Sequence, residues 1–170
     1  MIHRLIFAQA LAFAQALAFA RVLAFALVLA GHLWLSPMGL SAAQAAPALQ
    51  IETLDGTTHM FRVTVAKTPA EQAQGLMHVS DMAARTGMLF PMQPPRRARF
   101  WMRNTLIPLD MIFILPGGRI EQVVTRRDIK SDVSSASFGK VSAVLELNAG
   151  EAKALQIGIG DLVTMNGVRF

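Results

Sequence analysis

Two polar side chains with different chemistry lie within a strongly apolar stretch, residues 100–114. Asn104 offers a carboxamide and Asp110 a carboxylate, and a buried polar group costs free energy unless it is hydrogen-bonded. Asp110 could act as a general acid or base with a raised pKa, or as a ligand anchor. Alternatively, it could accept backbone N–H groups of the loop 104–107, because Pro108 bends this loop and lacks an N–H. We expect the structural role.

The residues just before Asp110 supply further candidates for ligand binding. These candidates are Trp101, Met102, Asn104 and Thr105. Trp101 could provide a stacking platform for a sugar or an aromatic ligand, or it could be packing. Phe100 and Met102 alternate with it, so if they fill the core, Trp101 must face outward or line a groove. The Asn-Thr pair favours a turn, because both side chains bond readily to nearby backbone.

Charged side chains suggest two more kinds of site. Four arginines could bind an anion, because guanidinium groups match carboxylates and phosphates, or they could form a solvated surface. They are Arg96, Arg97, Arg99 and Arg103. Glu146 is a possible second catalytic carboxylate. With Asp110 across a cleft, at about 5–10 Å, it would suit the hydrolysis of a glycosidic bond.

Several kinds of chemistry are excluded or disfavoured. The chain has no cysteine, which excludes disulfides, thiolate catalysis and cysteine-ligated metals. Methionines could bind Cu(I), but core packing is the commoner use of Met, and His59 and His78 lack the spacing of a metal site. The chain has no nucleophile elbow and no phosphate-binding glycine loop. We therefore expect no metal and no cofactor.

Residues 1–46 have the pattern of a secretory signal rather than of a folded segment. Arg4 precedes a long apolar run, and an A-x-A cleavage site ends at Ala45. We expect a signal peptide of residues 1–45 and a single domain of residues 46–170. The alternative is an uncleaved membrane anchor, because about 20 apolar residues can span a bilayer.

The charge and the leader together indicate the compartment and the partners. All 11 acidic residues follow the leader, which removes only two of the 16 basic ones, so the remainder has a net charge of +3. This is weak support for a nucleic-acid partner, and we expect none. We expect a periplasmic or secreted protein. If the leader is not cleaved, the protein would be anchored to the inner membrane, facing the periplasm, and only the N-terminal segment would contact the membrane.

The elements that would position these residues are mostly short strands. Apolar patterns and turn residues predict strands at 49–53, 57–66, 87–92, 98–103, 109–115, 119–127, 141–147, 162–165 and 168–170. The first two flank Asp55-Gly56, a strong hairpin signal. Pro94-Pro95 should break the chain, and the serine-rich segment 130–139 predicts a mobile loop.

Two short helices complete the predicted elements. Residues 68–71, Thr-Pro-Ala-Glu, supply an N-cap, a proline at N1 and a glutamate at N3 for a helix ending near 75–77. Asn148 could cap a second helix, with Glu151 at N3 and an end near Gly158. The predicted fold class is α+β: mainly antiparallel β, barrel- or sandwich-like, with two short helices.

Four motifs follow one another along the chain. They are Gly75-Leu76-Met77; Gly87-Met88-Leu89-Phe90; residues 100–105 with Pro108-Leu109-Asp110-Met111; and Val144-Leu145-Glu146-Leu147 with Ala149-Gly150, Gly158 and Gly160-Asp161. In content and order they resemble the domain-of-unknown-function 192 family of small, often exported prokaryotic domains. The resemblance spans most of residues 49–166, although segment 130–139 matches no motif. It implies a compact, mainly β domain and brings no known activity.

These observations lead to one expected function and two alternatives. We expect an exported binding or accessory module without catalytic activity, whose ligand is a small molecule or an envelope component bound near Trp101, Asn104 and Asp110. The first alternative is a hydrolase-like enzyme acting on an envelope polymer, with Asp110 as general acid or base and Glu146 as its partner. The second is a structural protein-interaction module, which a filled, pocketless core would favour.

Overall fold

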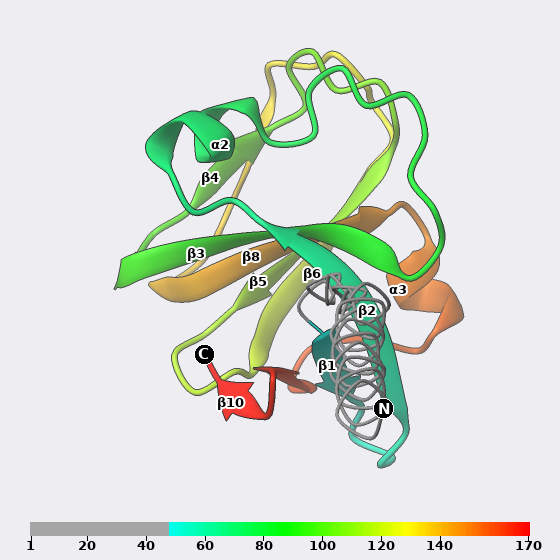
Figure 1. Ribbon diagram of the computed structural model, residues 1–170, viewed down its shortest axis with the longest axis vertical. Helices are drawn as coiled ribbons and strands as arrows, with labels where there is room; N and C mark the ends of the chain where they lie inside the picture. The colour runs from blue at the N-terminus through cyan, green and yellow to red at the C-terminus, as the bar shows by residue number, and fades with distance from the viewer. Residues whose placement is uncertain (1–47) are drawn as a thin grey trace, which may run out of the picture. The chain divides into compact units, whose positions relative to one another are not determined.

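The computed structural model describes residues 48–170, which are folded mainly as β-strands (Figure 1). The predicted signal peptide and its cleavage site lie outside the described residues. Within the described part of the chain, no helix is both long and apolar enough to cross a bilayer.

Eight strands form one largely antiparallel sheet in the order β10-β9-β1-β2-β3-β8-β5-β6, in which only β2 and β3 are parallel. The strands are β1 (Ala48–Glu52), β2 (Thr58–Val65), β3 (Thr86–Arg96), β5 (Leu109–Ile114), β6 (Ile120–Arg126), β8 (Val141–Asn148), β9 (Leu162–Met165) and β10 (Val168–Arg169). The sheet is folded over in a sandwich-like manner and is not a closed barrel. An isolated bridge between Arg119 and Leu162 connects the β6 end to β9. The predicted fold class is confirmed.

The β1–β2 hairpin forms where the sequence predicts it. Asp55 accepts hydrogen bonds from the Thr53 hydroxyl (2.5 Å) and from the Thr57 N–H (3.0 Å), which fixes the turn. Along β2, Phe61 and Val63 are buried while their neighbours on the other face are exposed. This alternation is the pattern of a strand with one buried face.

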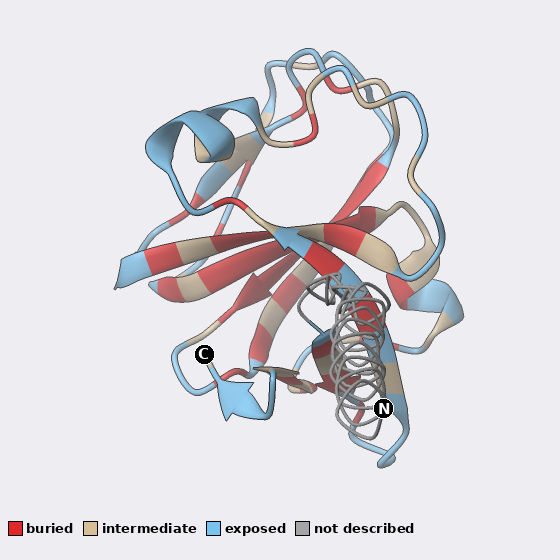
Figure 2. Cartoon of the chain, in the orientation of Figure 1, coloured by how far each residue is buried: buried red, intermediate tan, exposed pale blue. Residues whose placement is uncertain are grey.

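Apolar side chains are buried on both faces of the central strands (Figure 2). On β8, Ala143, Leu145 and Leu147 belong to a core cluster that also includes residues of β1, β2, β9 and α3. Val144 belongs to the cluster on the other face. Because successive side chains of a strand point to opposite faces, Glu146 projects to the same face as Val144.

Both predicted helices are present, but they are capped differently. Helix α2 (Pro69–Gln74) has the predicted capping box between Thr68 and Glu71. Helix α3 (Glu151–Ala154) begins after Gly150, with φ 90°, and has no side-chain cap. The prediction that Asn148 caps it, and that it reaches Gly158, is therefore wrong. The Asn148 carboxamide instead donates to the Met82 carbonyl (2.8 Å).

A separate two-stranded ribbon consists of β4 (Arg99–Trp101) and β7 (Ser134–Ala136). The predicted loop at 130–139 thus contains a strand. The buried Arg126 donates to the Ser135 hydroxyl of this strand (2.9 Å) and to the carbonyl of Val133, just before the strand (2.9 Å). Hydrogen bonding, rather than apolar burial, holds β7 in place.

Strand β3 continues past Pro94-Pro95, so the predicted end at Met92 is wrong. Its register with β8 shifts between Pro91 and Arg96. Proline cannot donate to a ladder and is tolerated where pairing is irregular, which explains how the strand accommodates both prolines.

Candidate functional site

A pocket lies beside α2 and β4, on the face of the sheet to which Glu146 projects. Its volume is about 200 Å³. Its walls come from α2 and the turn after it, from β3, from the segment around β4 and from one residue of β8. The lining residues are 72–77, Phe90, Met92, 96–101, Arg103, Thr105 and Glu146. We call this cavity the Glu146 pocket.

Glu146 is the acidic residue of the pocket, and its environment is unusual. The residue is 4 % exposed, and no residue between 48 and 170 hydrogen-bonds to its carboxyl group. Burial raises the pKa of this carboxyl from 4.5 to about 8, because a charge in low-dielectric surroundings is disfavoured. Near pH 7 the group is therefore mostly a neutral acid, which can both donate and accept a hydrogen bond.

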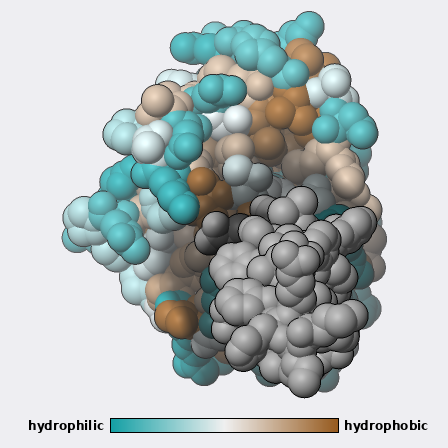
Figure 3. Space-filling model, viewed as in Figure 1, coloured by the Kyte–Doolittle hydropathy of each residue, from teal (hydrophilic) through white to brown (hydrophobic). Residues whose placement is uncertain are grey.

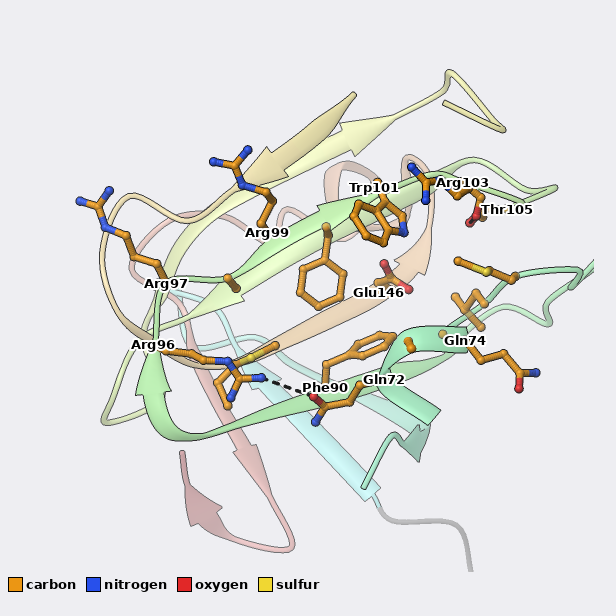
Figure 4. A pocket seen from close by; sticks show the side chains of 17 residues that line it. Gln72, Gln74, Phe90, Arg96, Arg97, Arg99, Trp101, Arg103, Thr105 and Glu146 are labelled. Atoms are coloured by element: carbon orange, nitrogen blue, oxygen red, sulfur yellow. Dashed lines mark hydrogen bonds between the residues drawn. The ribbon is translucent and has the colours of Figure 1, made fainter. Parts of the chain in front are cut away.

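Three aromatic rings form walls around this carboxyl group. The Phe90 and Phe100 rings meet edge to face, with centroids 5.0 Å apart. Trp101 is 44 % exposed, and the Arg103 guanidinium carbon lies 4.7 Å from its ring centroid. Figure 4 shows the Glu146 side chain pointing into the space between the Trp101 ring and the Phe90 ring.

The four predicted anion-binding arginines all line this pocket, and their positions give its mouth a positive charge. Arg96 donates to the Gln72 carboxamide (3.4 Å), and Arg103 pairs with the exposed Asp132 (2.6 Å). In Figure 4, the Arg97 and Arg99 side chains extend outward from the pocket. The pocket thus combines a cationic mouth, aromatic walls and a buried carboxyl group.

The predicted ligand-binding residues divide into two groups. Trp101 and Thr105 line the pocket with the arginines and Glu146. Met102 does not, because it is fully buried in the core beneath β4. Asn104 also lies outside the lining. Its backbone has φ 55°, a left-handed conformation that is common in turns and agrees with the predicted turn. Its carbonyl accepts a hydrogen bond from the His78 N–H (3.0 Å).

Asp110 is fully buried, but it lies outside the pocket and holds a different segment from the predicted one. Its carboxylate accepts from the backbone N–H groups of Gly150 and Ala152, both at 2.9 Å, and from the Thr125 hydroxyl at 2.6 Å. Asp110 therefore accepts backbone N–H groups, as the structural interpretation predicts, but these groups belong to the start of α3. The prediction that they belong to residues 104–107 is wrong. The first N–H groups of a helix have no intrahelical acceptor, and Asp110 supplies one.

The two carboxylates proposed as a catalytic pair do not share a cleft. In the β5–β8 ladder, Asp110 lies opposite Leu147 and Met111 lies opposite Glu146. The alternation of side chains therefore places Asp110 and Glu146 on opposite faces of the sheet. The geometry required for a pair of hydrolytic carboxylates is absent for these two residues.

Gln72, Gly75 and Phe90 are pocket residues that the sequence analysis did not select. Gln72 receives the Arg96 hydrogen bond. Gly75 has φ 49°, and a Cβ there would lie 3.3 Å from the Phe90 ring. For Gly75 and Phe90 the available signal was their membership in two glycine-containing motifs, which the structure brings together at one wall. Gln72 belongs to neither motif, and its sequence context gave no signal.

A second pocket, mainly apolar, opens between strands β2 and β3 and the segment that follows α2. Its lining includes Leu76, Val79, Met82 and Met88. Figure 3 shows hydrophobic side chains gathered in the upper part of the view, where Figure 1 places the segment between α2 and β3. No residue that lines this second pocket is a buried acid like Glu146, so we assign the pocket no role.

Residues 50–165 match the domain-of-unknown-function 192 (DUF192) family, described as "Uncharacterized ACR". The chain belongs to the DUF192 family. The resemblance inferred from the four motifs is therefore confirmed. Residues from all four motifs, among them Gly75, Phe90, Trp101 and Glu146, line one pocket of this DUF192 domain.

Two crystal structures are similar to this DUF192 domain. One, from Sinorhizobium meliloti 1021, is described as "a putative transcription regulator"; it is 37 % identical, with a TM-score of 0.69, covering 72 % of this chain and 95 % of that one. The other is a protein of unknown function from Novosphingobium aromaticivorans DSM 12444. It is 38 % identical, with a TM-score of 0.66, covering 69 % and 83 % of the two chains. No curated protein matches the chain.

Proposed function

We propose that this DUF192 protein is an exported, non-catalytic module that binds a small molecule in the Glu146 pocket. The observation that carries the proposal is the Glu146 carboxyl group, buried at 4 % exposure and without a protein partner. Its oxygen atoms are open to the pocket rather than sealed within the core, so they are available to a ligand. In these low-dielectric surroundings a hydrogen bond from a ligand to Glu146 is stronger than the same bond in water.

The surroundings of Glu146 suit binding for two further reasons. Small-molecule sites combine aromatic walls with a few convergent polar groups, and Phe90, Phe100 and Trp101 supply aromatic walls within a lining whose exposed surface is mainly polar. The pocket also argues against the alternative of a structural module with a filled core. Arg96 and Arg103 lie at the mouth, where they can attract an anionic group before the ligand enters.

The alternative of an envelope-polymer hydrolase has one supporting observation. A buried carboxyl with a pKa of about 8 is the kind of group that serves as a general acid near neutral pH. Hydrolysis of a glycosidic bond, however, requires a second carboxyl group on the other side of the bond that is cleaved. Asp110 projects from the opposite face, and the Glu146 pocket is lined by no second carboxylate. Binding is therefore the function that we favour.

The proposal that the protein is exported rests on the predicted signal peptide, residues 1–45. An apolar run followed by an A-x-A site that ends at Ala45 is typical of a cleaved secretory signal. We expect that expression of the full-length gene in the native host gives a protein beginning at Ala46. Intact-mass measurement of the periplasmic and membrane fractions tests this. Recovery of the uncleaved chain in the membrane fraction would favour the anchor instead.

A fluorescence screen tests binding in the pocket. The chain contains two tryptophans, Trp34 and Trp101, and no tyrosine, so a cleaved protein would have Trp101 as its dominant fluorophore. We expect some members of a library of neutral, anionic and zwitterionic fragments to change its emission saturably, and Glu146→Ala to weaken them at least tenfold. A library that never perturbs Trp101, or hits that Glu146→Ala leaves unaffected, would contradict the proposal.

A further inference from the structure

We propose that the Glu146 pocket selects a small zwitterion, with an amine at its inner end against Glu146 and an acidic group at its outer end among the arginines. This inference rests on the proposed binding function and names the chemical class of the ligand. It follows from the different chemistry of the floor and the mouth of one pocket.

The floor of the pocket favours an amine. Glu146 has no hydrogen-bond partner among the described residues, and an ammonium group offers three N–H donors together with the charge that an ionised carboxylate prefers. The surrounding walls are the Phe90, Phe100 and Trp101 rings. Aromatic faces attract cations, most strongly where water is excluded.

The mouth of the pocket favours an acid. Its ionisable groups are Arg96 from β3, Arg97 from the turn before β4, Arg99 from β4 and Arg103 after β4, whereas the α2 wall adds only uncharged side chains such as Gln72 and Gln74. Guanidinium groups match carboxylates and phosphates. The Asp132 partner of Arg103 is exposed, and an exposed ion pair is weak because water screens it, so an incoming anion can displace Asp132.

The size of the pocket sets the scale of the ligand. A volume of about 200 Å³ is smaller than the roughly 300–1,000 Å³ of pockets that hold drug-sized ligands. This space suits a molecule of a few carbon atoms between its two charged ends. An intact polymer chain would not fit inside, although its terminal unit could.

Binding of an amine should also move a proton. In the free protein Glu146 carries its proton near pH 7, because burial raises its pKa to about 8. An ammonium group stabilises the ionised carboxylate, so the Glu146 proton is released to solvent when the ligand enters. Calorimetry in two buffers with different ionisation enthalpies measures this release, which should approach one proton per ligand.

The test uses a series of unbranched ω-amino acids, from glycine to 6-aminohexanoate, with the purified protein expressed from the full-length gene. Each is compared with the alkylamine and the alkyl carboxylate of the same chain length. We expect one length to bind at least tenfold more tightly than either monofunctional analogue. Glu146→Gln should remove both the affinity that the amine adds and the release of a proton on binding. The double variant Arg96→Gln/Arg103→Gln should remove the affinity that the acidic group adds.

Arg127→Gln is the matched control, because Arg127 is exposed and does not line the pocket; it should leave all affinities unchanged. If carboxylates bind as tightly as ω-amino acids, and Glu146→Gln has no effect, the inference is wrong while the binding function stands. The same holds if uncharged fragments bind best. If neither this series nor the fragment library perturbs Trp101, both the inference and the binding function are wrong.

Discussion

Asp110 on β5 and Glu146 on β8 lie on adjacent strands, yet they project from opposite faces of the sheet. Asp110 has three hydrogen-bond donors around it, and Glu146 has none among the described residues. Two buried acids in neighbouring ladder positions therefore have different roles: one holds the fold together, and the other faces the pocket. Substitutions at the two sites should consequently have opposite effects on stability.

Asp110→Asn should destabilise the protein. The carboxamide keeps the shape but loses the charge that strengthens the bonds from the Gly150 and Ala152 N–H groups. Hydrogen bonds to charged groups contribute about 1.5–3 kcal/mol, so the melting temperature should fall by several degrees in a thermal unfolding experiment. Asp81→Asn, at an exposed position, is the control. An unchanged or higher melting temperature for Asp110→Asn would instead favour a functional role.

Glu146→Gln should change how stability depends on pH. The pKa of Glu146 is about 8 in the folded protein and lies near its ordinary 4.5 after unfolding. Between these values the folded state binds more protons, so the free energy of unfolding falls as pH rises, by at most about 1.4 kcal/mol per unit. The Glu146 contribution levels off above pH 8.

Glutamine cannot ionise, so the variant should lack this contribution and become more stable than the natural protein at pH 9. Urea denaturation between pH 5 and pH 9 measures the difference between the two proteins. Glu52→Gln, at an exposed position of β1, should leave the pH profile unchanged. Parallel profiles for Glu146→Gln and the natural protein would show that Glu146 does not titrate in this range.

Gly87→Ala should destabilise the sheet beneath the pocket. A Cβ at Gly87 would lie 2.3 Å from the Glu146 carbonyl oxygen and 2.7 Å from a Leu147 methyl carbon. Overpacking of this kind costs about 1–3 kcal/mol, which chemical denaturation can measure. Gly158→Ala is the matched control, because a Cβ there would meet no atom within 4 Å. Equal effects of the two substitutions would contradict the close contact at Gly87.

Arg126→Lys should loosen β7 without unfolding the main sheet. Arg126 is 8 % exposed and bonds to Asp128, Val133 and Ser135 together, and lysine lacks the planar group that makes this possible. Amide hydrogen exchange should accelerate in residues 128–136 and remain slow in β8. Arg127→Lys, at the exposed neighbouring position, is the control. Unchanged exchange in β7 would show that Arg126 is not what holds this strand.

Local sequence signals predicted the elements that depend on nearby residues. The hairpin at Asp55-Gly56 and the capping box of α2 involve partners two to four residues apart, and both are confirmed. The outward orientation of Trp101 between Phe100 and the buried Met102 also follows from simple alternation.

Features that depend on distant partners could not be predicted in the same way. The N–H donors of Asp110 are 40 and 42 residues away along the chain, whereas the nearby Pro108 loop was the local candidate. Strand β7 contains serines, whose burial depends on Arg126 and could not be inferred from apolar patterning. Glu146 was selected as a catalytic partner of Asp110, but only the register of β5 with β8 shows that the two are on opposite faces.

The ribbon of β4 and β7 lies outside the eight-stranded sheet, and it carries the Trp101 wall and Arg99 of the pocket. Its ties to β6 are side-chain bonds, from Gln122 to the Ala136 carbonyl and from Arg126 to Ser135. Mutations on the outward face of this ribbon would leave the ladder bonds of the large sheet intact. Ligand preference in such a fold could therefore diverge between species, or be re-engineered by grafting a new ribbon, while the scaffold that carries Glu146 stays the same.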